Sequence, residues 1–462
     1  MSINDTFAFQ NIGLPDDILR RKIYGDFPGA IRLIDLWLER EDIPYALRQS
    51  LILQREMMDR IGEEYPYSRE EAVAVVREHI ADFSFEEFEA LVDTKKIDWI
   101  YVDGQMRIFG RFFQTLCKAN PDFARRAGVK LPGVESASTG SFEDNRLNVS
   151  MRKMKQNGSM TNRIRIRATV RVKDAFFEPG MFIRAHLPIP CACKQQSDIR
   201  IERIEPPNGM ISPENAAQRT VCWEERMTDN HEFLVEYSYL HTACYHDLHS
   251  VPGQPSQYRE FTEEQAPHIV FTPYIRALVE ELSKGITDPL EKARAFYDYI
   301  TKNMKYTFMP SYFIMENIAE TCARNLTGDC GVFALLFITM CRCAGIPACW
   351  QSGLAAEPDF CGGHDWVCFY VEPYGWVFAD PSYGIAAVRA GNEERRQFYF
   401  GNLDPYRMVA NSAFMAPFTV DKQHWRGDPY DNQVGEMETA DRGLRYCEYE
   451  RFKEVLSCDE TE

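Results

Sequence analysis

Cys330, His364 and Asp380 are residues of types that could carry out nucleophilic acyl transfer. Cys330 follows Gly328 and Asp329 and opens a predicted helix. A thiol at a helix N-terminus lies beside unpaired amides and the positive end of the helix dipole, which favours the thiolate. The thiolate is the attacking species in acyl transfer, and the same amides can hold a developing oxyanion. The position of Cys330 therefore predicts a nucleophile.

A nucleophilic thiol needs a base, and the base needs a group that orients it. His364 begins one predicted strand and Asp380 ends the next, with Tyr374 and Gly375 as the turn between them. Neighbouring strands of a hairpin lie about 4.7–4.9 Å apart, so the two side chains can meet across it. We expect Asp380 to fix the imidazole tautomer and His364 to face the thiol.

Each of the three residues also has a structural explanation when taken alone. A cysteine in a helix is usually a small core residue, and this chain has 14 cysteines. Asp380 precedes Pro381 and could form a turn, and His364 could be a hydrogen-bonded residue at a strand end. The occurrence of Cys330, His364 and Asp380 together, in this order, would seldom arise by chance.

Three separate blocks around these residues resemble the core of the transglutaminase-like superfamily, bacterial type. They are Gly328–Phe337 with Cys343–Ala348, then Gly363–Val367, then Gly375–Ser382, preceded by a lead-in helix at Ala293–Tyr306. The resemblance covers residues 265–390. It implies a papain-like fold, with Cys330 as nucleophile, His364 as general base and acid, and Asp380 as the orienting residue.

Members of this family often add an oxyanion donor upstream of the cysteine. Tyr306 and Tyr312 are the candidates, because a phenol can donate a hydrogen bond to an oxyanion. The alternative for either tyrosine is packing within an aromatic turn. Trp366, next but one to His364, is expected to form a wall of the substrate pocket.

The first stretch of the chain, residues 1–131, predicts a helical domain. Ser68 with Glu71 and Ser84 with Glu87 have the form of capping boxes, in which a hydroxyl is followed three residues later by a glutamate. Apolar residues then recur at helical spacing. No catalytic constellation occurs here, so we expect a structural cap, with a docking or oligomerisation module as the alternative.

A second domain, residues 144–262, follows a polar linker at 132–143 and predicts an antiparallel β-sandwich. Residues 163–172 alternate apolar and polar side chains, which is typical of a half-buried strand. Residues 233–239 alternate in the same way, and further strands are expected at 182–188, 198–204 and 218–225.

A third domain, residues 265–462, predicts the catalytic region with a C-terminal extension. Asp288 and Pro289 form a helix-start signal. Helices precede strand-like runs in this region, so the whole chain is expected to be a multidomain α+β protein.

The composition excludes several classes of function. The formal net charge is −17, which argues against nucleic acid or an anionic membrane as a partner. No run of about 18 apolar residues occurs, and the N-terminus lacks the pattern of a secretory signal. We therefore expect a cytoplasmic protein with reduced cysteines and no membrane partner.

Metal binding is considered for one short segment. His241, Cys244, His246 and His249 lie within nine residues, but their spacing matches no known zinc pattern. Cys191 and Cys193 are too close in sequence for an ordinary zinc pair. We expect a strand end and loop here, and no metal or cofactor.

The sequence thus predicts a cysteine-dependent enzyme acting on a peptide or amide substrate through a thioester. Hydrolysis is favoured over crosslinking, because water is always available and transfer requires a pocket that prefers an amine. The alternative is a binding or scaffold protein that keeps the fold without turnover.

Overall fold

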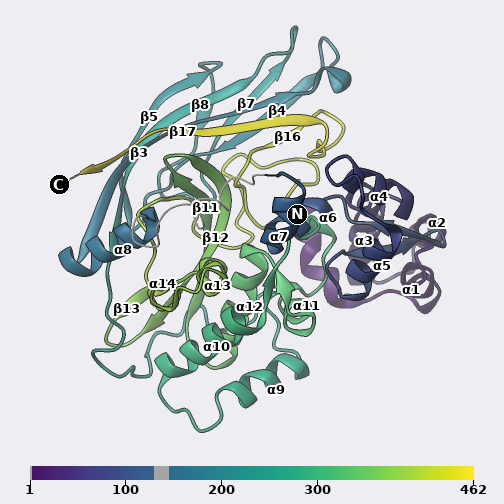
Figure 1. Ribbon diagram of the computed structural model, residues 1–462. Helices are drawn as coiled ribbons and strands as arrows, with labels where there is room; N and C mark the ends of the chain where they lie inside the picture. Colours follow the sequence, from purple (N-terminus) through teal and green to yellow (C-terminus); the bar gives the residue numbers. More distant parts are fainter. Residues whose placement is uncertain (1–2, 130–144, 462) are drawn as a thin grey trace.

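The computed structural model describes residues 3–129 and 145–461. A helical N-terminal region lies beside a group of helices packed on a sheet, and a pair of sheets lies above both (Figure 1). The expected mixture of helices and sheets is confirmed.

The N-terminal region is mostly helical. Its helices are η1 (Ile3–Ile12), α1 (Asp16–Ile23), α2 (Phe27–Leu38), α3 (Tyr45–Glu64), α4 (Arg69–Arg77), α5 (Phe85–Asp93), α6 (Phe112–Ala119) and α7 (Pro121–Arg126). Ser68 and Glu71 form the predicted reciprocal capping box at the start of α4. Ser84 caps α5 by accepting a hydrogen bond from the Glu87 amide at 3.1 Å.

A short hairpin, β1 (Trp99–Val102) and β2 (Gln105–Ile108), interrupts these helices. Asp103 and Gly104 form its turn, and both have positive φ. An Asp-Gly pair favours a tight hairpin turn, so the sequence held a signal for this element.

A sandwich of two antiparallel sheets follows helix α8 (Arg146–Asn157). The predicted linker at 132–143 lies outside the described residues. The sandwich elements are β3 (Ser159–Val172), η2 (Asp174–Phe176), β4 (Phe182–Pro188), β5 (Gln196–Glu205), β6 (Met210–Ile211), β7 (Thr220–Arg226) and β8 (Phe233–Cys244). Each predicted strand is therefore present, and β4 has the predicted bounds.

Two strands from the C-terminal end complete these sheets. The strand orders are β17-β3-β8-β5 and β16-β4-β7-β6, where β16 is Glu436–Glu438 and β17 is Tyr449–Thr461. The predicted division at residue 265 assigned this segment to the catalytic domain, and that assignment is wrong. The long edge of β3 offers unpaired backbone groups, and β17 satisfies them along almost its whole length.

The remaining region combines helices with a five-stranded sheet of order β14-β13-β12-β11-β15. Its helices are α9 (Pro273–Leu282), α10 (Pro289–Asn303), η3 (Tyr312–Ile314), α11 (Ile318–Asn325), α12 (Cys330–Cys343), α13 (Pro381–Arg389) and α14 (Glu393–Phe398). Its strands are β9 (Lys305–Tyr306), β10 (Thr327–Gly328), β11 (Ala348–Glu357), β12 (Phe360–Val371), β13 (Gly375–Ala379), β14 (Phe400–Gly401) and β15 (Arg407–Asn411).

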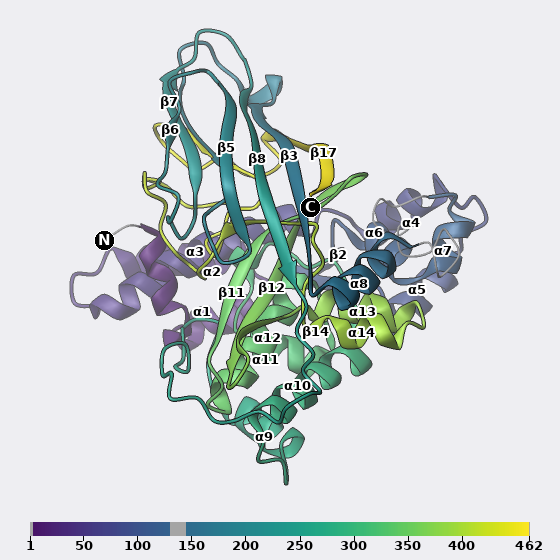
Figure 2. The same ribbon diagram turned by 90° about the vertical axis from the view of Figure 1, so that its left-hand side faces the viewer.

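Helix α12 is the centre of this region. Residues 331–342 of the helix are all buried, as expected for a helix that is hydrophobic all round. Val367 and Phe369 of β12 belong to the same core, so the sheet packs on α12. Figure 2 shows β11 and β12 between the helices below and the sandwich above. Leu354 of β11 and Met408 of β15 enter the sandwich core, which joins the two parts.

Within the described residues, no helix is both long enough and apolar enough to cross a bilayer.

Candidate active site

Cys330 is the first residue of α12. Asp329 caps the helix by accepting a hydrogen bond from the Val332 amide at 3.3 Å. Helix geometry leaves the first amides of α12, those of Cys330 and Gly331, without intrahelical acceptors. The cysteine side chain is partly exposed. Cys330 therefore opens a helix directly after Gly328 and Asp329, as the sequence predicts.

His364 and Asp380 meet across the β12–β13 hairpin. His364 Nε2 lies 2.7 Å from Asp380 Oδ2, and both side chains are buried. The histidine lies within β12 and not at its start, since the strand begins at Phe360. Asp380 directly follows β13, as expected, and is also the N-cap of α13.

The Asp380 carboxylate is fixed through both oxygens. Its Oδ1 accepts from the Tyr383 amide at 2.9 Å, which caps α13. Its Oδ2 faces His364 and also lies 2.9 Å from Nη1 of Arg407 in β15. Arg407 is completely buried and pairs with Asp404 as well. These contacts hold the carboxylate in one orientation toward the imidazole.

The electrostatics of this pair suit a general base. Burial lowers the pKa of His364, although the Asp380 charge opposes that effect. Burial alone would raise the pKa of Asp380, but His364 and Arg407 bring it below its ordinary value. The imidazole is therefore neutral near pH 7 and donates its Nε2 proton to Asp380. Its Nδ1 then carries the lone pair that a base requires.

The Cys330 thiol has a different neighbour. That neighbour is Asp365, the residue after His364 in β12, and it acts on the pKa of the thiol. Burial raises the pKa of Cys330 well above its usual value, and the Asp365 and Asp329 charges raise it further. Burial and these carboxylates thus oppose the thiolate that the helix N-terminus favours. Among the described residues, no hydrogen bond joins Cys330 to His364.

Asp365 belongs to a buried polar network. Gln433 donates hydrogen bonds to Asp365 and, at 2.8 Å, to Oδ2 of Asp431. Burial raises the pKa of both aspartates, Asp365 the more strongly. Asp431 and Gln433 come from a polar C-terminal segment for which the sequence suggested no role. The sequence reasoning also passed over Asp365, although it adjoins His364.

The structure places the two candidate oxyanion donors near the head of α12. Tyr306 lies in β9, which pairs with β10 just before Cys330. The Tyr312 hydroxyl donates a hydrogen bond to Asp329. Trp366 is fully buried behind His364, with ring centroids 6.0 Å apart, and its indole donates to Gln351 at 2.9 Å.

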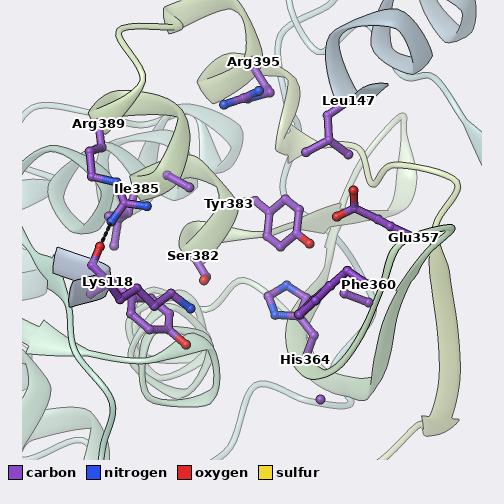
Figure 3. Close-up of a pocket in the computed structure, with 14 residues that line it drawn as sticks. Lys118, Leu147, Glu357, Phe360, His364, Ser382, Tyr383, Ile385, Arg389 and Arg395 are labelled. Carbon is purple, nitrogen blue, oxygen red and sulfur yellow. Dashed lines mark hydrogen bonds between the residues drawn. The ribbon is translucent and has the colours of Figure 1, made fainter. Parts of the chain in front are cut away.

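A pocket of about 130 Å³ opens beside His364. Tyr306, Ser382 and Tyr383 line it, together with Lys118 from the N-terminal region. Figure 3 shows the Lys118 ammonium, the Ser382 hydroxyl and the His364 ring pointing into the same space. Lys118 lies in α6, far away in sequence, so no local signal could have assigned it to this site.

The segment considered for metal binding is the end of β8 and the loop after it. His241 is buried, and burial lowers its pKa to about 4. Cys244 and His249 are exposed. In the parts of the chain that the structure describes, no three His, Cys, Asp or Glu residues form a group that could hold a metal.

Comparisons with known proteins assign the core of this region to a family. Residues 276–381 match the family model of the transglutaminase-like superfamily. This segment contains Cys330, His364 and Asp380. No curated protein matches the chain.

Three solved structures resemble the chain distantly. A candidate cysteine protease from Cytophaga hutchinsonii is 15% identical with a TM-score of 0.40, covering 66% of this chain and 91% of that one. The periplasmic domain of TgpA from Pseudomonas aeruginosa is 14% identical with a TM-score of 0.28, covering 54% and 96%. A candidate protease from Parabacteroides distasonis is 14% identical with a TM-score of 0.23, covering 46% and 42%.

Proposed function

We propose that this chain, whose residues 276–381 form a transglutaminase-like core, is a cysteine-dependent enzyme that cleaves a peptide or amide substrate through a thioester. The observation that carries the proposal is the hydrogen bond between His364 and Asp380 at 2.7 Å, beside a pocket and within the same core as Cys330. In this proposal Cys330 is the nucleophile, His364 the base and Asp380 the orienting residue.

In the first half of the reaction, the Cys330 thiol turns from Asp365 toward His364 and gives its proton to Nδ1 of the imidazole. The sulfur attacks the substrate carbonyl carbon, and the amides of Cys330 and Gly331 hold the oxyanion. His364 then gives the proton to the leaving amine, the C–N bond breaks and a thioester remains. Asp380 stabilises the imidazolium that forms in between.

In the second half, His364 takes a proton from water, and the water oxygen attacks the thioester carbon. The C–S bond breaks, His364 returns the proton to the leaving sulfur, and an acid and the free thiol result. The charges around the pocket favour water over an amine as acceptor. Lys118 and Arg389 both line the pocket, and their positive charges disfavour an alkylammonium ion. Hydrolysis is therefore the proposed outcome.

The test is a mass-spectrometric search for an acyl adduct on Cys330 after incubation with a peptide library. We expect an adduct in the wild-type protein, much slower adduct formation in His364→Gln because acylation also needs the imidazole, and none in Cys330→Ala. A primary amine added to the reaction should leave the free acid as the main product. Reaction of an electrophile at other cysteines, with Cys330 unreactive under limiting reagent, would contradict the assignment.

A specific observation favours the rival function, a binding or scaffold protein without turnover. Asp365 is a neighbour of the Cys330 thiol and raises its pKa. Consecutive side chains of a strand point to opposite faces, so Asp365, and not His364, takes the side of β12 on which Cys330 lies. The rival predicts that His364→Gln leaves the reactivity of Cys330 unchanged.

The partner in this proposal is a peptide or protein substrate, and the location is cytoplasmic. Neither nucleic acid nor a membrane is required. Cell fractionation with an antibody to the chain tests the location.

A further inference from the structure

The pocket beside His364 gathers positive charge from three separate helices. Lys118 comes from α6, Arg389 from α13 and Arg395 from α14. Arg389 donates a hydrogen bond to the Lys118 carbonyl oxygen at 2.7 Å, the dashed line in Figure 3. That bond ties the N-terminal region to α13 and brings the two cations together at the pocket.

None of these three cations forms an ion pair with a carboxylate among the described residues. The Lys118 ammonium lies 3.9 Å from the centroid of the Tyr306 ring. Arg395 is only 3% exposed, and its guanidinium donates to amide oxygens of Asn145 at 3.3 Å and Asn148 at 3.4 Å. Amide and carbonyl oxygens satisfy hydrogen bonds but do not neutralise charge.

Two buried arginines elsewhere in the chain, by contrast, form ion pairs with carboxylates. The chain has 69 acidic and 52 basic residues, so carboxylates are in excess. Arg396 pairs with Asp298 at 2.5 Å and with Glu393 at 2.6 Å, and Arg407 pairs with two aspartates. A buried charge is costly unless it is paired. Arg395 is buried, Lys118 is half-buried and Arg389 is exposed at the pocket rim, and none of them has a carboxylate partner among the described residues. The pocket therefore favours an anion.

The cations also destabilise one another. Burial, together with the Arg389 and Arg111 charges, lowers the pKa of Lys118 to about 8, although Cys330 and Asp329 oppose this. Glu357, the carboxyl group that lines the same pocket, does not relieve the repulsion. It pairs with Arg146 at 3.2 Å, and burial raises its pKa to about 7.

We propose that this pocket binds a carboxylate of the acyl donor, so that the substrate is an acidic peptide with a carboxylate close to the reacting carbonyl. Lys118 and Arg389 are the residues in direct contact with that carboxylate, and Arg395 contributes charge from behind. This inference rests on the proposed function, because it specifies the substrate of the same site. It also gives the N-terminal helical region a role in substrate binding.

Carboxylates near the thiol oppose the charge of these cations. Asp329 and Asp365 are both near Cys330, and burial raises the pKa of each. If these aspartates dominated the field at the thiol, an anionic substrate would be repelled. The sign of the field at Cys330 therefore decides the inference, and it can be measured without a known substrate.

The experiment compares alkylation of Cys330 by iodoacetate and by iodoacetamide, reagents of similar size that differ in charge. Peptide mapping by mass spectrometry follows Cys330 alone. The rate with iodoacetate divided by the rate with iodoacetamide does not depend on the thiolate fraction of Cys330. Dividing this ratio by the same ratio for free cysteine gives a quotient that also removes the intrinsic difference between the reagents. We expect this quotient to be about tenfold above one at low salt and to fall as salt screens the cations.

Substitutions identify the source of the effect. Arg389→Gln and Lys118→Gln should each bring the quotient toward one. Arg226→Gln, a matched change at an exposed residue at the end of β7, should leave it unchanged. Arg389→Gln is the more telling variant, because Lys118 also influences the pKa of Cys330. The iodoacetamide rate of each variant shows whether the site is intact.

Each outcome has a meaning. A quotient at or below one, with Cys330 readily alkylated, overturns the acidic-peptide inference and leaves the proposed function standing. Failure of both reagents to alkylate Cys330 overturns the proposed function and this inference together. A quotient above one that Arg389→Gln and Lys118→Gln both leave unchanged also overturns the assignment to these cations.

Peptide substrates then distinguish the source of the carboxylate. One arm offers peptides with an Asp or Glu side chain and an amidated C-terminus, and the other offers neutral side chains with a free C-terminus. Faster acyl-adduct formation on Cys330 in either arm than with a fully neutral peptide supports the proposal. Equal rates in all three contradict it.

Discussion

Asp380 Oδ2 lies 2.9 Å from the Arg407 guanidinium, and both side chains are completely buried. The same oxygen accepts the hydrogen bond from His364. The carboxylate that orients the imidazole is therefore itself held by a buried cation from β15. This arrangement keeps the pKa of Asp380 below its ordinary value despite burial, so the carboxylate stays ionised when His364 changes its protonation state.

Arg407→Met should destabilise the protein strongly. Removing one partner of a buried ion pair leaves uncompensated charge, here on Asp380 and Asp404, and costs about 3–5 kcal/mol. Urea denaturation followed by circular dichroism measures the free energy of unfolding. Arg125→Met is the control, because Arg125 forms an exposed pair with Asp122 that contributes little. Equal midpoints for the two variants would show that the buried network is not required.

Asp380→Asn should separate orientation from capping. Asparagine caps a helix about as well as aspartate, so α13 should remain intact. The amide can no longer stabilise an imidazolium or select the Nε2 proton. We expect turnover to fall by about 10²–10⁴-fold. The denaturation midpoint should fall less than in Arg407→Met, because Arg407 loses one carboxylate partner but keeps Asp404. Turnover within threefold of wild type would remove Asp380 from the proposed catalytic machinery.

The pKa of Cys330 is the most direct measure of its surroundings. Burial, Asp365 and Asp329 all raise it, so alkylation by iodoacetamide should have a midpoint well above pH 8.5. Asp365→Asn removes one of the two carboxylates, and the midpoint should move down by about one unit. At pH 8 the variant should therefore react faster. A wild-type midpoint near 8.5 that Asp365→Asn does not change would show that these groups do not act on the thiol.

Local signals in the sequence predict the elements that carry the site. Alternation of apolar residues predicts β3 and β8, and the Gly-Asp before Cys330 predicts the start of α12. Tertiary contacts had no such signal. Arg407 and Lys118 approach the site from elements distant in sequence. Strand β17, near the C-terminal end, pairs with β3, which lies far before it in the sequence. For Cys330, the helix position favours the thiolate, whereas burial and two neighbouring aspartates raise the pKa of the thiol.

Glu357 should make the protein less stable as the pH rises. Burial, followed by Asp404, raises its folded pKa from 4.5 to about 7. The folded chain thus holds a proton that the unfolded chain releases between these values. The stabilising contribution is fully present below pH 4.5 and is lost as the pH rises through 7.

Glu357→Gln removes this titration. Relative to wild type, the variant should gain stability between pH 5 and pH 8, by at most about 3 kcal/mol. Urea denaturation of both proteins at the two pH values measures the difference, and titration of all other groups cancels. A variant that loses stability relative to wild type as the pH rises would contradict the sign of the shift.

Gly331→Ala should disturb the head of α12. A Cβ at this position would lie 3.0 Å from Asp365 Oδ2 and closer still to the Tyr312 hydroxyl, so one of these side chains must move. Alanine elsewhere in a helix is favoured over glycine by about 1 kcal/mol. Gly62→Ala in α3, where a Cβ meets nothing within 4 Å, is therefore the control and should stabilise the protein. For Gly331→Ala we expect lower stability and an altered rate of iodoacetamide reaction at Cys330, because the two neighbours that shift both border the thiol. If both variants gained stability equally and Cys330 reacted at the wild-type rate, the close packing of Tyr312 and Asp365 against the helix start would be refuted.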